Sequence, residues 1–209
     1  MPYIYSMEQS RKRLFIDKKT KLNERIKAIQ LAAENKYNTL VFPLSECCSG
    51  LNREYIRLAE KHSFIIEAGG HDLSILMPRR LFLFHRNLFR MDQGKRKIAH
   101  HFCTTNPKTI AIITERARYL FSRSLRTVTE PRIFHLMPDE GHEETWCACP
   151  ACRAFSFCEQ YIIAVNSAAD ALAKIDPEAR LAFMDFGEDP QAPGMYHVGI
   201  GVRANMVKI

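Results

Sequence analysis

The chain has 209 residues, 46% of them hydrophobic and 25% charged, with a formal net charge of +7. This composition is ordinary for a soluble globular protein, and the length allows one sizeable core. No apolar run approaches the length of a membrane-spanning helix, and residues 1–6 do not resemble the start of a secretory signal. We therefore expect no membrane partner and, by default, a cytoplasmic location.

A strand-then-helix rhythm runs along the chain. Short apolar segments predict five strands, at residues 2–6, 39–43, 64–68, 132–137 and 180–186. Apolar residues at helical spacing predict four helices between them, and their starts are marked by the capping signals Thr20, Asn52, Asn106 with Pro107, and Ser156 with Glu159. Residues 71–105 fit this rhythm least well and predict a long excursion.

Alternating strands and helices predict parallel pairing with right-handed crossovers. A doubly wound sheet and a barrel both satisfy this pattern, but the strand ends favour the barrel. Acidic residues fall at or just past the C-terminal ends of the predicted strands, and the ends of barrel strands meet at one mouth. They are Glu46, Glu67, Asp139, Glu140, and Asp185 with Glu188.

A complete barrel needs roughly 250 residues. We therefore predict an α/β fold with an incomplete TIM-barrel-like (β/α) repeat of about five strands and four or five helices. Residues 1–209 would form a single partial domain, with an insertion at 71–105 and a cysteine-rich loop at 141–155.

The segment Pro138-Asp139-Glu140-Gly141 places two adjacent carboxylates after a predicted strand. Glycoside hydrolysis needs one carboxylic acid and a second group at the oxocarbenium centre. Neighbouring residues on an extended chain point to opposite sides, so one of the pair would act on the substrate while the other orients a group. The alternative is an acidic loop without a catalytic role.

Three of the seven cysteines form the cluster Cys147, Cys149 and Cys152. Thiolates at this spacing can bind a tetrahedral Zn²⁺, with Cys158, His142 or an oxygen as the fourth ligand. We predict a structural zinc on Cys147, Cys149, Cys152 and Cys158. A thiol cluster without metal, or one disulfide with a spare thiol, remains the alternative.

Basic residues lie in four clusters, and these suit either an anionic partner or a solvated surface. No aromatic residue alternates with them as a base-stacking surface requires, which makes nucleic acid an unfavoured partner. The clusters are Arg11-Lys12-Arg13, Lys18-Lys19, Arg79-Arg80 and Lys95-Arg96-Lys97.

Several motifs together resemble a family of bacterial glycoside-hydrolase-like barrel proteins that carry a domain of unknown function. This family is distantly similar to α-glucuronidases and β-N-acetylhexosaminidases. The resemblance covers about residues 37–189. It rests on Glu67-Ala68-Gly69-Gly70-His71-Asp72, Cys103-Thr104-Thr105-Asn106-Pro107, Pro138-Asp139-Glu140-Gly141, Cys147-x-Cys149-x-x-Cys152 and Val165-Asn166-x-Ala168-Ala169.

The resemblance implies a (β/α)₈ barrel, a carbohydrate partner and, if the chain is active, hydrolysis of O-glycosyl bonds. It makes Glu140 the candidate general acid, Asp139 its partner and His71 a substrate contact. The convergence of strand ends adds Glu46, Glu67 and Asp185 as expected substrate contacts. Relatives continue into further strands, so this chain is expected to be catalytically incomplete if truncated. The alternative function is a non-catalytic zinc-bearing module that binds an anionic partner such as nucleic acid.

Overall fold

The computed structural model describes residues 11–139, 145–184, 203 and 205–208. Six strands form one sheet in which every neighbouring pair is parallel. Their order in the sheet is their order in the chain. The strands are β1 (Arg13–Phe15), β2 (Thr39–Phe42), β3 (Ile65–Gly70), β6 (Ile133–Leu136), β7 (Arg180–Phe183) and β8 (Met206–Lys208).

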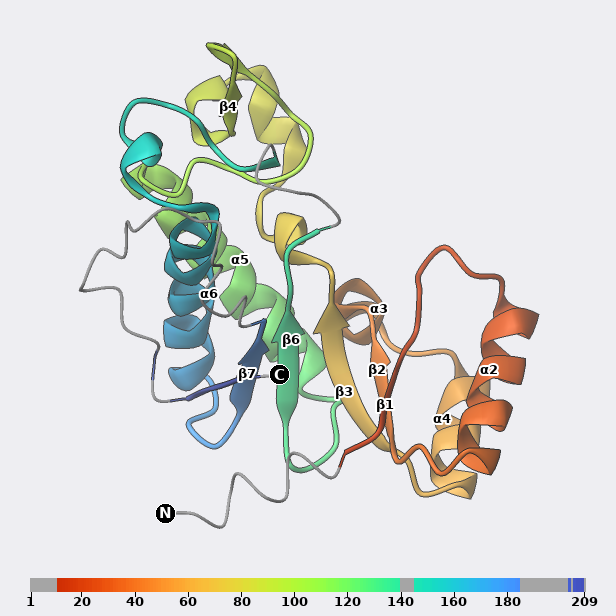
Figure 1. Ribbon diagram of the computed structural model, residues 1–209. Coiled ribbons are helices and arrows are strands. Elements are labelled where there is room, and N and C mark those ends of the chain that lie inside the picture. The colour runs from red at the N-terminus through yellow and green to blue at the C-terminus, as the bar shows by residue number, and fades with distance from the viewer. Residues whose placement is uncertain (1–10, 140–144, 185–202, 204, 209) are drawn as a thin grey trace.

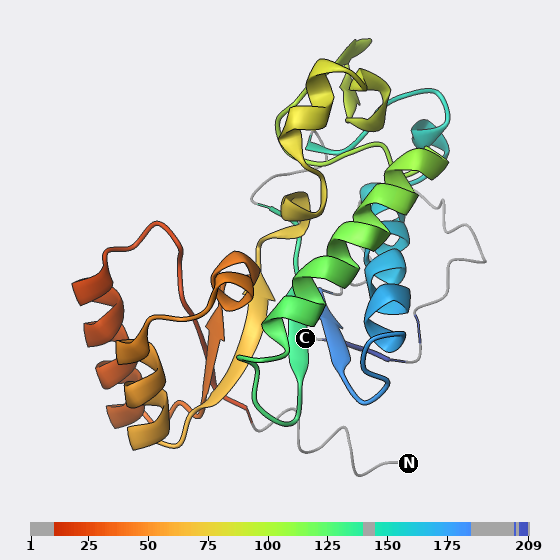
Figure 2. The same cartoon turned by 180° about the vertical axis from the view of Figure 1, so that it is seen from behind.

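Five α-helices pack on one face of this sheet (Figures 1 and 2). A strand order that never reverses sends each right-handed crossover over the same face, as in the wall of a barrel. The predicted α/β class with parallel strands is confirmed, and the sheet of the described residues stays open. The helices are α2 (Leu22–Glu34), α3 (Leu44–Ser49), α4 (Arg53–Lys61), α5 (Pro107–Ser124) and α6 (Phe157–Ala173).

The predicted helix starts are largely confirmed because their signals are local. The side chain of Asn52 accepts a hydrogen bond from Glu54 N, and that of Asn106 accepts one from Lys108 N. Ser156 forms the predicted capping box at α6. Only the first helix differs, because its N-cap is Lys21 rather than Thr20.

Two of the six strands were not predicted. Strand β1 was hidden because its three residues, Arg-Leu-Phe, overlap the cluster Arg11-Lys12-Arg13, which suggested a solvated loop. Strand β8 lies in a segment whose sequence shows no clear alternation. The predicted strand at 2–6 lies outside the described residues.

The excursion after β3 forms a lobe beyond the C-terminal ends of the strands (Figures 1 and 2). The lobe consists of short secondary-structure elements, and its described residues contain no long helix. These are the 3₁₀ helices η1 (Leu73–Leu76), η2 (Arg79–Leu83) and η3 (Arg86–Leu88), and the antiparallel hairpin β4 (Met91–Asp92) with β5 (Lys95–Arg96).

The main hydrophobic core lies between the sheet and the helices. Leu40 and Phe42 of β2, Phe134 of β6 and Leu181 of β7 are fully buried in it. Side chains alternate across a strand, so the residues between these point to the opposite face, called here the helix-free face because the described residues place no helix on it. That face carries Arg13, Glu67 and His135, and it therefore differs in chemistry from the core.

Across the described residues, no helix combines the length and the apolar character needed to cross a membrane.

Strands β3 and β6 pair at Gly69 and His135, and the backbone there leaves no room for a side chain on residue 69. Its φ is +122°, and a Cβ there would lie 1.9 Å from the carbonyl oxygen of His135. Only glycine fits, since an L-residue meets both steric strain and a backbone clash. This contact fixes the last residues of β3 beside β6, where the candidate site lies.

We expect Gly69→Ala to lower the free energy of unfolding by about 3 kcal/mol or more, through strain and overpacking together. Gly50 offers a matched control, because its φ is +100° but no atom lies within 4 Å of the added Cβ. Gly50→Ala should cost about 1–2 kcal/mol. Urea unfolding followed by circular dichroism compares the two, and equal losses would contradict the close approach.

Candidate functional site

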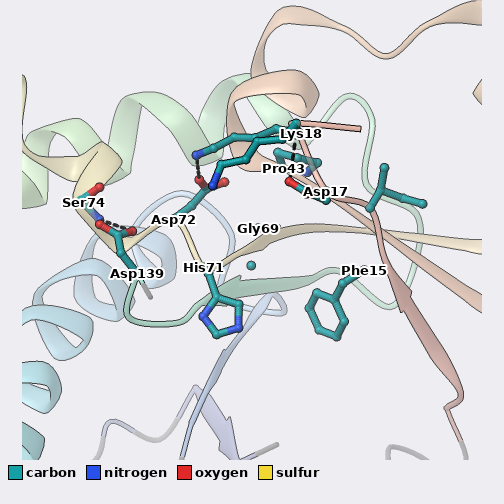
Figure 3. Close-up of a pocket in the computed structure, with 12 residues that line it drawn as sticks. Phe15, Asp17, Lys18, Pro43, Gly69, His71, Asp72, Ser74 and Asp139 are labelled. Atoms are coloured by element: carbon teal, nitrogen blue, oxygen red, sulfur yellow. Dashed lines mark hydrogen bonds and ion pairs between the residues drawn. The ribbon is translucent and has the colours of Figure 1, made fainter. Parts of the chain in front are cut away.

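A cavity of about 530 Å³ lies at the C-terminal ends of β1, β2, β3 and β6. The ends of neighbouring parallel strands converge there, which is where barrel-like folds place their sites. Its polar lining comes from the segments that leave these strands (Figure 3). The polar side chains are those of Asp17, Lys18, Lys19, His71, Asp72, Ser74 and Asp139.

Lys18 and Asp72 form an ion pair across this cavity, with Nζ 2.9 Å from Oδ1 (Figure 3). The hydrogen bond to Asp72 raises the pKa of Lys18 above its ordinary value, and the nearby charge of Asp139 acts in the same direction. The second oxygen of Asp72 accepts a hydrogen bond from Leu44 N at 3.3 Å. Asp72 is therefore held by the fold, whereas Lys18 is half exposed and available to a ligand.

His71 and Asp139 are the two predicted site residues that line the cavity. His71 Nδ1 donates to the carbonyl oxygen of Pro138 at 2.7 Å, which leaves Nε2 as the ring nitrogen that a ligand can contact. The Asp139 carboxylate accepts from Ser74 N at 3.4 Å through Oδ1. The contact with Pro138 ties the end of β3 to the segment that carries Asp139.

This arrangement is suited to binding a polyhydroxylated ligand. It presents carboxylate acceptors, a lysine donor and an imidazole nitrogen around one hollow, and these groups match the hydroxyls of a sugar. Phe15 supplies an apolar surface at the same cavity, and its side chain is 43% exposed. An exposed aromatic ring beside polar groups is a common way to hold the flat face of a sugar ring.

Glu67 does not line the cavity. It is fully buried on the helix-free face, where its carboxylate meets Arg11 Nη1 at 2.5 Å, Arg13 Nε at 2.7 Å and His135 Nε2 at 2.6 Å. Burial alone would raise its pKa, but the hydrogen bonds and charges of His135 and Arg13 lower the pKa of Glu67 to about 2. The cluster predicted as a basic surface thus contributes two arginines to a buried network.

Burial lowers the pKa of His135, while the hydrogen bond and the charge of Glu67 act in the opposite direction. Its Nε2–H donates to Glu67, and its Nδ1 has no partner within the described part of the chain. The ring also meets Phe15 edge-on, with centroids 5.4 Å apart. The network therefore lies directly behind the cavity wall and supports Phe15.

Glu46 also lies away from the cavity. It is in α3, and both of its carboxylate oxygens accept from Arg25 Nη1 of α2, at 3.0 and 2.9 Å. This pair joins two helices on the other side of the sheet from Glu67. The expected convergence of Glu46 and Glu67 on one mouth is therefore not seen in this structure.

Glu140 and Asp185 fall outside the described residues, so their roles remain predictions. Lys18 was not singled out from the sequence as a site residue. It follows β1 by three positions, and recognising that short strand would have placed it at the mouth.

Four buried cysteines form a second candidate site: Cys103, Cys147, Cys149 and Cys152. Their sulfur atoms all lie within 4.8 Å of one another. Cys103 Sγ is 3.7 Å from Cys149 Sγ and 3.6 Å from Cys152 Sγ. These distances are too long for a disulfide but close to the about 3.8 Å between sulfurs around a tetrahedral zinc.

The surroundings of the cysteines also suit thiolates. Met91 N donates to Cys147 Sγ at 3.3 Å, and Arg96 Nη1 lies 3.8 Å from the same sulfur. The hydrogen bonds among these thiols lower the pKa of Cys103 and raise that of Cys147. The donor set therefore fits a metal such as zinc, which prefers buried sulfur ligands.

The fourth cysteine of this group is Cys103 rather than Cys158, which lies in α6. Cys103 is 44 positions before the Cys147–Cys152 segment, so sequence spacing alone could not assign it. The signal that could have found it is its place just before the Asn106 cap, at the return from the excursion.

Neither a protein-family model nor a curated protein matches this chain. Among solved structures, it is similar to the crystal structure of a β-galactosidase from Bacillus circulans sp. alkalophilus, with a TM-score of 0.52 and 11% sequence identity. The match covers 83% of this chain and 36% of that one, so the chain spans little more than a third of the β-galactosidase. At this identity the likeness shows the fold alone.

Proposed function

We propose that the chain is a glycoside-hydrolase-like protein that binds a carbohydrate in the cavity at the C-terminal ends of its strands. The observation that carries this proposal is the convergence of Lys18, His71, Asp72 and Asp139 on that cavity. The likeness to a β-galactosidase, an enzyme that hydrolyses a glycosidic bond, supports it through the shared fold.

In this proposal His71 Nε2 and Asp139 hydrogen-bond sugar hydroxyls, and Lys18 orients the ligand from the segment that follows β1. Glu140 is the proposed general acid, since it directly follows Asp139. Asp139 would then orient the substrate or polarise an acetamido group. Asp185 is a further proposed substrate contact. Glu46 and Glu67, with their arginine partners, would support the fold rather than touch the ligand.

We also propose that Cys103, Cys147, Cys149 and Cys152 bind one structural zinc ion. The bound metal would supply no reaction step, because four protein ligands leave no open coordination position. It would hold the cysteine-rich segment against the lobe. Gln160 of α6 assists, since its side chain bonds both Cys147 N and Cys147 O at 3.2 Å.

Asp139→Asn tests the binding site. We expect it to weaken binding of a sugar by about tenfold, as for one lost charge-assisted hydrogen bond of about 1.5 kcal/mol. Isothermal titration with galactose, glucuronate and N-acetylglucosamine identifies the ligand with wild-type protein first. Glu60→Gln is the control, because Glu60 is an exposed residue of α4 away from the cavity, and this variant should bind the sugar like wild type.

Glu140→Gln, measured on aryl glycosides of the sugar that binds, tests the proposed acid separately. Loss of hydrolysis with retained binding supports it, and unchanged turnover would remove Glu140 from that role. If none of the three sugars binds the wild-type protein, the carbohydrate proposal is wrong.

A further inference from the structure

The positive charge of the molecule is concentrated in one segment. Residues 79–101, called here the basic lobe, contain seven Lys and Arg residues and one acid, Asp92. The segment thus carries a net charge of +6 out of the chain's +7. Two of the basic clusters that are separate in the sequence, Arg79-Arg80 and Lys95-Arg96-Lys97, lie together in it.

Some of these basic side chains stabilise the lobe by hydrogen bonds to its backbone carbonyl groups. Arg79 donates to the carbonyl oxygens of Ile98 and His100, and Arg96 donates to that of Phe89. Arg90 donates to the carbonyl oxygen of Ala99. Four basic side chains of the lobe remain. Arg80, Arg86, Lys95 and Lys97 are exposed, and none has a carboxylate partner among the described residues. Their charge is therefore available to an external anion.

The same lobe exposes two adjacent large apolar side chains. Leu83 is 74% exposed and Phe84 81%, more than any other large hydrophobic residue of the described chain. The preceding Phe82 turns inward and packs edge-on against Phe89, with ring centroids 5.1 Å apart. Phe82 is therefore half-buried within η2, while Leu83 and Phe84 beside it are exposed.

The position of the basic lobe in the fold suits contact with an extended surface. It stands beyond the C-terminal ends of the strands in both views (Figures 1 and 2). Its base is tied to the cysteine cluster, since Ala148 N donates to Met91 O at 2.8 Å and Cys103 N to Leu88 O at 2.9 Å. A rigid attachment of this kind lets the exposed tip dock without rearranging.

The combination of charge and apolar surface decides between possible occupants. A nucleic acid would satisfy the basic side chains and could stack a base on Phe84, but it would leave Leu83 against a polar backbone. An anionic lipid surface satisfies both features: phosphates meet the basic side chains, and the boundary between headgroups and acyl chains accepts the apolar ones.

We propose that the basic lobe docks the protein onto an anionic lipid surface, with Leu83 and Phe84 inserted at the headgroup boundary and Arg80, Arg86, Lys95 and Lys97 near the lipid phosphates. The contact is peripheral. It departs from the expectation of no membrane partner, which rested on the lack of an apolar segment long enough to span.

Co-sedimentation of the 209-residue chain with vesicles tests this proposal. We expect binding to vesicles of phosphatidylcholine with phosphatidylserine and little binding to phosphatidylcholine alone, with affinity falling as salt rises. The double variant Leu83→Ser/Phe84→Ser should weaken binding by about tenfold or more. Lys95→Glu/Lys97→Glu should weaken it by about tenfold or more as well.

Matched controls come from exposed residues elsewhere. Leu31→Ser changes an apolar side chain that is 58% exposed on α2, and Lys27→Glu/Lys61→Glu reverses two exposed charges on α2 and α4. Both should bind vesicles like wild type. All the variants alter exposed side chains, and equal melting temperatures confirm that they fold.

Three results would overturn the proposal. The first is no sedimentation of wild-type protein with the anionic vesicles. The second is unchanged binding of the Leu83→Ser/Phe84→Ser variant, which would mean that no apolar insertion occurs. The third is lobe-dependent binding of a labelled single-stranded RNA that displaces the protein from vesicles at equal phosphate concentration, which would assign the surface to nucleic acid.

Discussion

Cys103→Ser is expected to abolish tight zinc binding. The protein refolded with zinc and then dialysed should hold about one zinc per chain, as a closed four-thiolate site does. Serine removes one of the four sulfur ligands, and its hydroxyl is not a thiolate at neutral pH. Mass spectrometry of the bound metal measures the ratio, and wild-type stoichiometry in Cys103→Ser would contradict the site.

Stability should follow the metal. A ligand present at a thousandfold above its dissociation constant stabilises the folded state by about 4 kcal/mol, and Cys103→Ser should lose most of this. Chelation of wild-type protein should lower its melting temperature, and added zinc should restore it. Acidification should also release the metal, because protons compete for the thiolates.

Two further variants separate this cluster from the other thiols. Cys158→Ser tests the ligand set predicted from spacing, and it should retain the zinc. Cys48→Ser replaces a half-buried cysteine of α3 and should also retain it. Loss of zinc in Cys158→Ser with retention in Cys103→Ser would favour the set predicted from the sequence.

Helix starts could be predicted from the sequence, but the fourth cysteine of the cluster, Cys103 rather than Cys158, could not. Helix starts such as Asn106-Pro107 were predictable because the cap and its partner lie within three residues. The fourth cysteine was not, because the return of the chain after the 71–105 excursion decides which thiol lies near the other three. No local pattern encodes that return.

Glu67 illustrates a second limit. The sequence placed it at a strand end, because the strand was expected to stop at Ala68. The structure extends β3 through Gly69 and Gly70, both with positive φ, so Glu67 is the third of six strand residues. Its carboxylate therefore points into the sheet's helix-free face. The position of Glu67 within the strand, rather than its being a carboxylate, therefore explains why it belongs to the buried network and not to the cavity.

The two predicted site residues that line the cavity both follow strands that the sequence predicted. His71 and Asp139 follow β3 and β6, strands of six and four residues that are adjacent in the sheet. Lys18 follows a strand of three residues and was missed for that reason. The part of the site built by these two strands was predictable, and the part built by the short edge strand β1 was not.

The buried network around Glu67 leads to the second large effect. We expect Glu67→Gln to lower the free energy of unfolding by about 3–5 kcal/mol, since it removes the only carboxylate among the described residues that faces Arg11 and Arg13. Those arginines would then stay buried or half-buried with unpaired charge. Glu115→Gln breaks an exposed ion pair with Arg118 on α5 and should leave stability almost unchanged.

The effect of Glu67→Gln on the free energy of unfolding should depend on pH. The folded-state pKa of Glu67 is about 2, below its ordinary value of 4.5. The folded state therefore binds fewer protons at this site, so its contribution is complete above about pH 5 and is lost as the pH falls toward 2. Denaturant unfolding of wild type and Glu67→Gln between pH 7 and pH 2 measures the difference. That difference should shrink steadily below pH 5, because a protonated Glu67 and a glutamine both lack the charge. A difference that stays constant over this range would show that packing, and not the carboxylate charge, accounts for the stability that Glu67 provides.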